Sequence, residues 1–359
     1  MRIAHVAPVI HPVPPATYGG TERVIADLAA AQITKGHEVT LFGPAESTLP
    51  GVQQVGDYRS LSWYEAAHGN VPPGLPAVLE AQLLRDLMAH APGHDIIHLH
   101  GSAHASAAAG ACGIPVFRTI HWRADELDHV EHFRAFPQER VIAISQSQGE
   151  VVPPESLAGV VHHGMPVTRY RKGEGEGQHL AFLGRMTDQK RPDRAIALAK
   201  ETGRELHLAG PVDPGNPDYF DRVVRPELSG GIRHVGSVDD AGKQALLGSA
   251  AALVFPIDWP EPFGLVMIEA MACGTPVIAW RRGSVPEVVE DGLTGIVVDS
   301  GEEAAARMDE VAALDRDLIR RRFEERFSSD RMAQDTLALY RVALQSRSSN
   351  DSSASSPSP

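Results

Sequence analysis

The stretch FPIDWPEPFGLVMIEAMACGTP, residues 255–276, indicates the fold more directly than any other part of the chain. The apolar run Ala252–Phe255 predicts a buried strand, and after a proline-rich loop a helical pattern begins near Phe263. Gly274 is suited to end this helix, and Pro276–Ala279 predicts the next strand. A strand, a helix and a second strand in such short succession are typical of a parallel βαβ unit.

The same alternation of short apolar runs and longer helical patterns extends over most of the chain. Further strands are expected at residues 3–7, 38–42, 96–99, 116–119, 141–144, 179–183, 205–209, 232–235 and 296–298. Helices are expected at residues 21–35, 77–90, 192–202, 241–250 and 263–272, and throughout the chain after residue 302. Apolar strands separated by helices form parallel sheets that are covered on both faces. The sequence therefore predicts an α/β protein with two Rossmann-like, doubly wound domains and a ligand at the carboxyl ends of the strands.

The boundary between the two domains is expected in the segment Val161–Gln178, which interrupts the alternation and is rich in Arg, Lys, Glu and Gly. Such a composition predicts an exposed connection. We expect a first domain over residues 1–165 and a second over residues 166–325. A C-terminal helix over residues 326–345 is expected to return to the first domain. Residues 346–359 are almost all Ser, Pro, Asn and Asp, so a disordered tail is expected there.

Length and composition fit two globular domains and exclude several classes of protein. The chain has 359 residues and a formal net charge of −13, which argues against nucleic-acid binding but still allows local cations to hold a small anion. Its two cysteines, Cys112 and Cys273, give neither a disulfide framework nor a zinc motif. No stretch resembles a signal peptide core or a membrane span, so we expect a cytoplasmic protein. The oligomeric state is left open.

Two carboxylates flank the start of the helix in residues 255–276. Glu261 is expected in the loop at the carboxyl edge of the sheet, and Glu269 about two turns into the helix. The free amides around Gly264 and Leu265 suit a phosphate, while carboxylates accept hydrogen bonds from ribose or hexose hydroxyls. This arrangement favours a sugar nucleotide as ligand. The alternative is that Glu261 caps the helix and Glu269 is solvated.

Cations and glycines occupy other strand-to-helix loops. Gly184 and Arg185 follow the first strand of the second domain, and Lys190 lies shortly before Pro192, which suits the first turn of a helix. Two fixed cations there can neutralise a diphosphate, although Arg191 and Arg194 nearby are consistent with ordinary surface charge. In the first domain, Gly19 and Gly20 allow a close approach of the backbone to a ligand, or make an ordinary turn.

The 17 histidines raise the question of a metal site. His98 and His100 share one strand face, His104 is near, and His162 and His163 are adjacent. Zinc needs three converging ligands with supporting partners. Polar lining of a cleft or packing between domains is the favoured interpretation, so no metal site is expected.

Taken in order, these motifs resemble family 4 of the retaining glycosyltransferases, the glycosyl transferases group 1, which have the GT-B fold. Glu261 and Glu269 fall on the E-x₇-E region of that family, and Gly184, Arg185 and Lys190 on its Gly-Arg-x₄-Lys pattern. Further matches cover the N-terminal glycine loop, the active-site histidine at the end of a first-domain strand, and two later loops; they are Gly19, Gly20, His121, Gly210 and Val235. The resemblance covers most of the chain.

The resemblance implies two Rossmann-like domains facing across a cleft, and retaining transfer from a nucleoside diphosphate sugar such as a UDP- or GDP-sugar. By the family's roles, Glu269 would hold the ribose and Glu261 the transferred sugar, while Arg185 and Lys190 would stabilise the leaving diphosphate. Gly20 and the amides near Gly264 would approach the phosphates, with Phe263 and Leu265 beside them, and His121 the sugar ring. Neither a metal nor another cofactor is implied. The departures from the family pattern are Arg281-Arg282-Gly283-Ser284 and Ile257-Asp258-Trp259-Pro260.

The acceptor is a small molecule or glycan that the sequence does not identify. The predicted helix Thr21–Lys35 has only Arg23 and Lys35 against Glu22 and Asp27, with no basic amphipathic stripe. We therefore expect a soluble acceptor and at most peripheral membrane contact. The alternatives are a nucleotide-sugar epimerase or hydrolase on the same fold, and a non-enzymatic sugar-binding protein. A nicotinamide dehydrogenase is disfavoured because the G-x-G-x-x-G fingerprint is missing.

Overall fold

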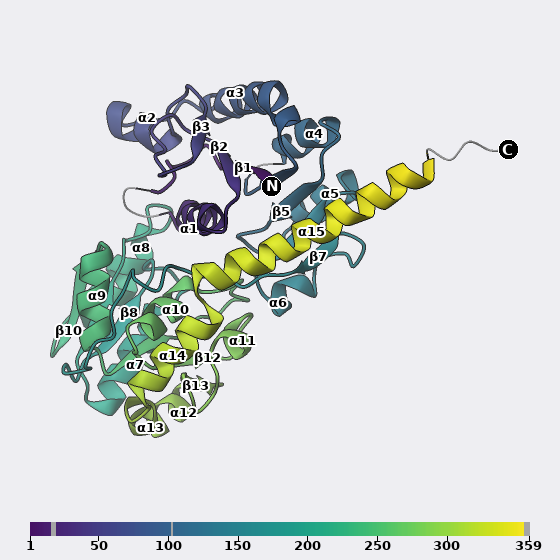
Figure 1. Ribbon diagram of the computed structural model, residues 1–359. Coiled ribbons are helices and arrows are strands. Elements are labelled where there is room, and N and C mark those ends of the chain that lie inside the picture. The colour runs from purple at the N-terminus through teal and green to yellow at the C-terminus, as the bar shows by residue number, and fades with distance from the viewer. Residues whose placement is uncertain (16–18, 102, 355–359) are drawn as a thin grey trace. The chain divides into compact units, whose positions relative to one another are not determined.

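The structure, a computed structural model, describes residues 1–15, 19–101 and 103–354, with side chains as far as Arg347 (Figure 1). The chain forms two compact units. The first comprises residues 1–165 together with residues 329–359, and the second comprises residues 166–328. None of the described helices combines the length and the apolar character that crossing a membrane requires.

Within the described part of the first unit, seven strands form one parallel sheet. The strands are β1 (Arg2–Val6), β2 (Glu38–Phe42), β3 (Gln53–Val55), β4 (Ile96–Leu99), β5 (Val116–Thr119), β6 (Arg140–Ala143) and β7 (Leu157–Val160). Their order across the sheet is β3-β2-β1-β4-β5-β6-β7. The central strands are almost wholly apolar because both faces are covered, and Ile3, Ile97 and Phe117 are each at most 1% exposed.

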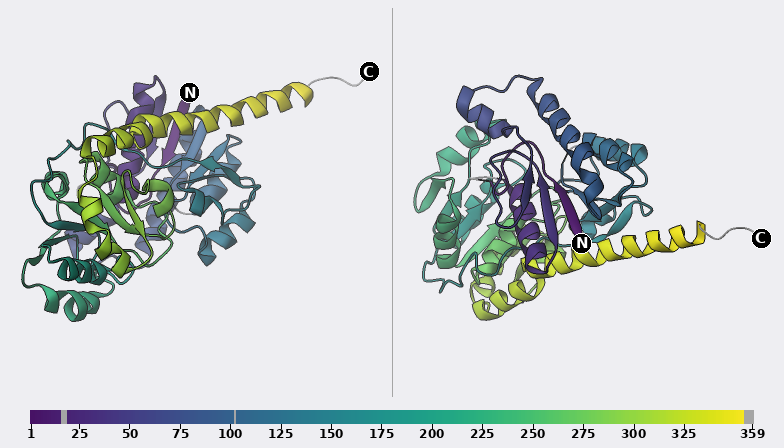
Figure 2. Two further views of the ribbon diagram at one scale, coloured as in Figure 1. Left: turned by 90° about the horizontal axis from the view of Figure 1, so that it is seen from below. Right: turned by 45° about the horizontal axis from the view of Figure 1, so that its top comes forward.

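The helices of the first unit cover this sheet. They are α1 (Gly20–Thr34), α2 (Leu61–His68), α3 (Leu75–His90), α4 (His104–Ala111), α5 (Leu127–Ala135), α6 (Gln146–Gly149) and α15 (Ser329–Ala354). The long helix α15, yellow in Figures 1 and 2, packs against α1 although some 300 residues separate them in sequence. Lys35, which caps the C-terminus of α1, forms an ion pair of 2.6 Å with Asp330 of α15.

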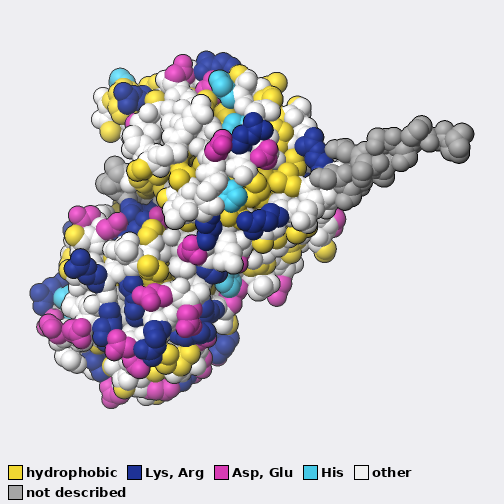
Figure 3. Space-filling model, viewed as in Figure 1, with side chains coloured by type: hydrophobic (Ala, Val, Ile, Leu, Met, Phe, Trp, Pro, Cys, Tyr) yellow, Lys and Arg dark blue, Asp and Glu magenta, His cyan; other side chains and the backbone are white. Residues whose placement is uncertain are grey.

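In the second unit, the described residues form a parallel sheet of six strands in the order β10-β9-β8-β11-β12-β13. The strands are β8 (Leu180–Leu183), β9 (Leu206–Ala209), β10 (Ile232–Gly236), β11 (Ala252–Phe255), β12 (Val277–Trp280) and β13 (Gly295–Val298). The helices are α7 (Pro192–Thr202), α8 (Pro217–Tyr219), α9 (Asp240–Ser249), α10 (Leu265–Ala272), α11 (Val285–Val288), α12 (Gly301–Ala306), α13 (Met308–Ala312) and α14 (Arg316–Arg326). On the face shown in Figure 3, acidic and basic side chains are interspersed over this unit.

Each sheet has one position at which the strand order reverses. In the first unit the reversal lies between β1 and β4, and in the second unit between β8 and β11. In open α/β sheets, loops diverge at such a switch point and leave a crevice at the carboxyl ends of the strands. The loops that follow β1, β4, β8 and β11 are therefore the positions at which this fold presents functional side chains.

The structure differs from the sequence expectations at the edges of the first sheet and in the connection between the units. The polar strand β3 lacks the apolar pattern that predicts a strand, and the short apolar run of β7 is interrupted by Gly159, which weakens such a prediction. The segment Val161–Gln178, expected to be exposed, is packed in its first part: Val161, Met165 and Tyr170 are 5%, 3% and 1% exposed, while residues 171–178 are exposed or partly exposed. Its apolar side chains drive this packing, because each belongs to the core of its own unit.

The expected disorder from Ser346 onward is wrong for the backbone of residues 346–354, which continues α15. A helix that is already formed extends at little cost, and the Ser346 hydroxyl donates to the carbonyl of Val342 one turn earlier. The rest of the predicted tail, residues 355–359, lies outside the described residues.

Candidate active site

The loop that follows β11 places Glu261 in a buried ionic contact. Glu261 is 7% exposed, and its Oε2 accepts from Lys190 Nζ at 2.5 Å and from the indole Nε1 of Trp259 at 2.8 Å. Lys190 comes from the loop after β8, so the two strands at the switch point of this sheet supply the pair. Lys190 Nζ also lies 5.0 Å from the ring centre of Trp259, a cation–π contact. A fixed cation is thus held beside a carboxylate at the carboxyl edge of the sheet.

A second buried carboxylate lies inside α10. Glu269 is 4% exposed, and its Oε1 accepts from Lys243 Nζ of α9 at 2.7 Å. Among the described residues, the other oxygen, Oε2, has no hydrogen-bond partner. A buried carboxylate oxygen left without a donor is costly, so this atom is a candidate to accept a hydrogen bond from a ligand.

The backbone between the two glutamates is fixed by close contacts. Gly264 precedes α10 with φ 79°, and a Cβ there would lie 2.7 Å from Met267 Cε, so the turn requires glycine. Gly283 lies against the backbone of Glu261, where a Cβ would be 2.3 Å from the Glu261 carbonyl oxygen. Ser284 adds hydrogen bonds from its amide to the Glu261 carbonyl at 3.0 Å and from its hydroxyl to the Phe263 carbonyl at 2.8 Å. The departure Arg281-Arg282-Gly283-Ser284 therefore holds the Glu261 loop in place.

The remaining predicted residues of the second unit are distributed over its carboxyl edge. Arg185 follows β8, is partly exposed, and lies 3.5 Å from Asp213 in the loop after β9. Gly184 and Gly210 directly follow the last residues of β8 and β9. Phe263 is buried and Leu265 begins α10. Val235 is 47% exposed on the edge strand β10, which β9 separates from β8.

Two residues of this site were not identified from the sequence. Lys243 lies on a helix whose pattern is that of an ordinary surface helix, and Trp259 is in the loop that departs from the family pattern. The surface-charge alternative holds for Arg191 and Arg194, since both form ion pairs with Asp258. Arg185 and Lys190 contact other carboxylates, so the four cations divide into two sets. The alternative in which Glu269 is a solvated helix residue is wrong, because it is buried.

In the first unit, the predicted glycine loop is only partly described. Gly19 caps α1 and is buried, Gly20 is the first residue of that helix, and residues 16–18 lie outside the described residues. His121 follows β5 after Ile120 and is partly buried, at the same edge of the sheet as the ends of β1 and β4. Its Nε2 is hydrogen-bonded to His100 Nδ1 at 3.0 Å, and its ring stacks on that of His163 with centroids 5.2 Å apart.

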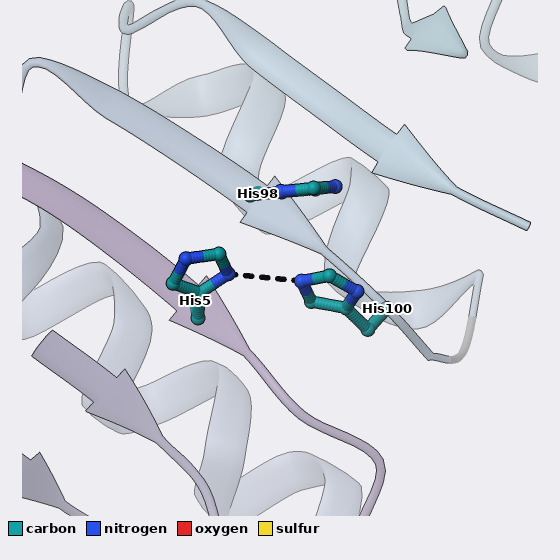
Figure 4. Close-up of side chains that lie close together, drawn as sticks. All are labelled: His5, His98 and His100. Carbon is teal, nitrogen blue, oxygen red and sulfur yellow. Dashed lines mark hydrogen bonds between the residues drawn. The ribbon is translucent and has the colours of Figure 1, made fainter. Parts of the chain in front are cut away.

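His121 is one end of a network of buried histidines. His5 of β1 bonds through Nδ1 to His100 Nε2 at 2.9 Å (Figure 4). Through Nε2 it bonds to Gln32 Oε1 of α1 at 2.7 Å. His98 bonds to Thr119 Oγ1 at 2.7 Å and to the Tyr340 hydroxyl of α15 at 2.5 Å. Burial lowers the pKa of His5 to about 4 and that of His121 to about 3, and holds the pKa of His98 and His100 well below the ordinary range. These rings are neutral at pH 7.

His5, His98 and His100 lie close enough together to be considered as metal ligands. Each of their six ring nitrogens, however, already has a hydrogen-bond partner within 3.0 Å. A metal would have to displace at least the His5–His100 bond and one partner of His98. The hydrogen bonds explain the cluster without a metal, and His104 and His162 are not among its members.

Comparison with known protein families gives two matches. Residues 18–219 match the model described as glycosyltransferase family 4, and residues 169–327 match the model described as glycosyl transferases group 1. The chain is 30% identical to a D-inositol 3-phosphate glycosyltransferase of Actinosynnema mirum, over 78% of this chain and 80% of that protein. It is 28% identical to a phosphatidyl-myo-inositol mannosyltransferase of Mycobacterium tuberculosis, over 90% of each.

Solved structures share the fold over nearly the whole chain. AviGT4, a glycosyltransferase of avilamycin A biosynthesis, has a TM-score of 0.71 at 24% identity and covers 96% of this chain and 98% of its own. A sucrose-phosphate synthase of Thermosynechococcus elongatus has a TM-score of 0.76 at 19% identity and covers 96% and 99%. The Anabaena protein HepE in complex with UDP and glucose has a TM-score of 0.69 at 18% identity and covers 94% and 98%. The expected GT-B type fold is confirmed.

Proposed function

The chain belongs to glycosyltransferase family 4, and from that premise we propose that it is a retaining transferase that moves a sugar from a nucleoside diphosphate sugar to an acceptor hydroxyl without a metal ion. One observation carries the proposal. The second unit holds two buried carboxylates, Glu261 and Glu269, on either side of the start of α10, each paired with a lysine. Simple surface charge does not explain such burial of charges.

A nucleoside diphosphate sugar matches this arrangement group by group. The unpartnered Glu269 Oε2 can accept from a ribose hydroxyl, and the first amides of α10 after Gly264 suit a phosphate. Lys190 and Arg185, from the loop after β8, supply the charge that balances the leaving diphosphate in place of a metal. Support for a nucleotide ligand also comes from HepE, which was solved with UDP and glucose. Retention of configuration is inferred from family membership.

The acceptor is proposed to be a soluble polyhydroxylated molecule of the inositol phosphate class. The names of the two relatives point to inositol-based acceptors, one of them water-soluble and the other a lipid. Helix α1 favours the soluble class. It packs against α15, and its C-cap Lys35 is paired with Asp330, so α1 does not offer a basic amphipathic face to a bilayer.

The test begins with binding and ends with product analysis. Isothermal calorimetry against UDP- and GDP-sugars identifies the donor, after which the purified protein is incubated with that donor and D-inositol 3-phosphate or phosphatidylinositol vesicles. We expect a glycosylated soluble product whose anomeric configuration, measured by NMR, equals that of the donor. Transfer to the lipid alone would refute the acceptor class, and an inverted product would refute retention.

The rival on the same fold is a nucleotide-sugar epimerase or hydrolase. Neither needs an acceptor, so either would convert the donor when it is the only substrate present. We expect donor consumption to depend on the acceptor and to rise in proportion to its concentration at low levels. Consumption at the same rate with and without acceptor would replace the transferase proposal with its rival.

A further inference from the structure

Three histidines of the first unit, His5, His100 and His121, form with Gln32 a continuous hydrogen-bond chain that ends at His121. Its members come from the ends of neighbouring elements: Gln32 from α1, His5 from β1, His100 after β4 and His121 after β5. The successive distances are 2.7 Å, 2.9 Å and 3.0 Å, all within the normal range for hydrogen bonds. Gln32, His5 and His100 have no part in the chemistry considered so far.

The donor and acceptor roles along this hydrogen-bond chain are fixed by Gln32. Gln32 Oε1 is an amide oxygen, which can only accept, so His5 Nε2 must carry the proton of that bond. In a neutral imidazole the other nitrogen then lacks a proton, so His5 Nδ1 accepts and His100 Nε2 donates. By the same rule His100 Nδ1 accepts from His121 Nε2. Each ring in the chain is thus the Nε2–H tautomer.

The neutrality that this argument needs follows from the surroundings. His5 and His100 are buried and His121 is partly buried, and loss of hydration lowers the pKa of each. The neighbouring histidines lower the pKa of His100 further, and Arg118, which pairs with Glu139 at 2.8 Å, lowers that of the adjacent His98. A second proton on His5 or on His100 would put two N–H donors face to face in one of the three bonds.

The hydrogen-bond chain ends at a buried ring nitrogen that carries a lone pair. His121 Nδ1 is left as an acceptor by the tautomer, and among the described residues it has no hydrogen-bond partner. Buried polar atoms without a hydrogen-bond partner are rare in folded proteins, so this nitrogen is a candidate to accept a hydrogen bond from a ligand. The ring cannot turn freely to find another donor, because it stacks on His163 and is bonded through Nε2.

We propose that Gln32, His5 and His100 are positioning residues that lock His121 in the Nε2–H tautomer, so that its bare Nδ1 accepts a hydrogen bond from a hydroxyl of the bound sugar substrate. The identity of the ligand rests on the proposed function, whereas the tautomer does not. The opposite tautomer would present an N–H at the same position, which prefers an ionised oxygen or a carbonyl. The hydrogen-bond chain therefore selects an uncharged, hydroxylated ligand over an anionic one at His121.

The tautomers can be measured directly by long-range ¹H–¹⁵N correlation of the histidine rings at pH 7.5 in the ligand-free protein. We expect His5, His100 and His121 all as neutral Nε2–H forms. Replacing Gln32 by the near-isosteric methionine removes the fixed acceptor, and His121 in Gln32→Met should then show a mixture of both tautomers. Thr119→Val is the matched control: it removes the buried partner of His98 instead, and should leave His121 unchanged.

Three outcomes would overturn the inference. The first is an Nδ1–H or charged His121 in the wild-type protein, which needs no variant to be observed. The second is a pure Nε2–H form in Gln32→Met. The third is a stoichiometric zinc ion bound by His5, His98 and His100, which would replace the hydrogen bond between His5 and His100.

Activity supplies a second readout once a donor is known. Gln32→Met should lower kcat/KM by about tenfold through the weakened hydrogen bond to the sugar, while Thr119→Val should retain the wild-type value. Wild-type kcat/KM in Gln32→Met would overturn the link to the substrate. The NMR result does not depend on turnover, so failure of the transferase proposal and failure of this inference remain distinguishable.

Discussion

The two switch points of the molecule use opposite electrostatics. In the second unit, the residues at the carboxyl edge are ionised and paired, as in the Lys190–Glu261 and Lys243–Glu269 contacts. In the first unit, the residues at the equivalent edge are neutral histidines joined by hydrogen bonds. One topology therefore supports an edge that can balance the charge of a diphosphate and another that suits an uncharged hydroxyl. Strand order determines where a site lies, and the side chains determine which chemistry it performs.

The largest effect expected from this comparison is a loss of stability in mild acid caused by the neutral histidines. Folding lowers the pKa of His5 from 6.5 to about 4 and that of His121 from 6.5 to about 3. Below pH 6.5 the unfolded chain binds protons that the folded protein excludes, so stability falls as the pH falls toward the folded pKa values. At pH 5 each of the two residues should lower the free energy of unfolding by about 2 kcal/mol relative to pH 7.5.

This loss is measured by chemical denaturation at the two pH values. His121→Gln removes one titrating group and should reduce the difference between pH 7.5 and pH 5 by about 2 kcal/mol. Val342→Ala, an exposed change that removes no titrating group, provides the control and should keep the wild-type difference. Equal stability of the wild-type protein at both pH values would mean that these histidines become charged without cost.

The second prediction removes the cations of the ionic edge. Arg185→Ala and Lys190→Ala should each lower kcat/KM by about 100-fold, because each removes positive charge from the leaving diphosphate. Steady-state kinetics with the identified donor measures this effect. Arg225→Ala serves as the control, since Arg225 pairs with the exposed Asp221 and lies over the ring of Phe220, and neither residue belongs to the site. Turnover at the wild-type level in either test variant would remove that residue from the active site.

The third prediction separates the two glutamates. Glu269→Ala should weaken binding of the free nucleoside diphosphate by about tenfold, because Glu269 is proposed to contact the ribose. Glu261→Ala should lower turnover while changing nucleotide affinity by less than about twofold, because its proposed partner is the transferred sugar. Calorimetric titration with the nucleotide distinguishes them, with circular dichroism to confirm folding. An equal loss of affinity in both variants would show that the two roles are wrongly assigned.

The smallest expected effect is that of metal removal. Because lysine, arginine and the amides of α10 are proposed to balance the diphosphate, treatment with EDTA should leave kcat unchanged. The same preparation with added Mg²⁺ should give the same rate. A complete loss of activity that Mg²⁺ restores would assign the charge balance to a metal and undermine the comparison between the two edges.

Much of the fold is predictable from the sequence because buried parallel strands have an unmistakable apolar pattern. The runs that became β2, β4, β5 and β11 were predicted to the residue, and α7 likewise. The edge strand β3 was not predicted because its sequence is polar, and β7 was not predicted because its apolar run is short and contains Gly159. The packing of Tyr170 could not be predicted from the sequence for a different reason. Its partner, Asp240, lies 70 residues further along the chain, and only the folded structure shows that the two side chains meet.

The site was predictable only where a residue type at a fixed spacing implies a role. Glu261, Glu269, Arg185 and Lys190 belong to such patterns, and the structure places all four at one edge of the second sheet. The lysine that neutralises Glu269 lies on another helix and has no pattern of its own. The histidine chain was missed as well, because His5, His100 and His121 are adjacent only across three strands of the sheet.

The return of the chain to the first unit at Ser329 has a consequence for how the protein is made on the ribosome. The second unit is continuous from residue 166 to residue 328 and can complete its core while synthesis continues. The first unit cannot, because Tyr340, which is fully buried and bonded to His98, emerges only after the whole second unit. A nascent chain stalled before α15 therefore leaves His98 without its tyrosine partner. We expect the first unit to complete its fold after the second, although its strands are translated first.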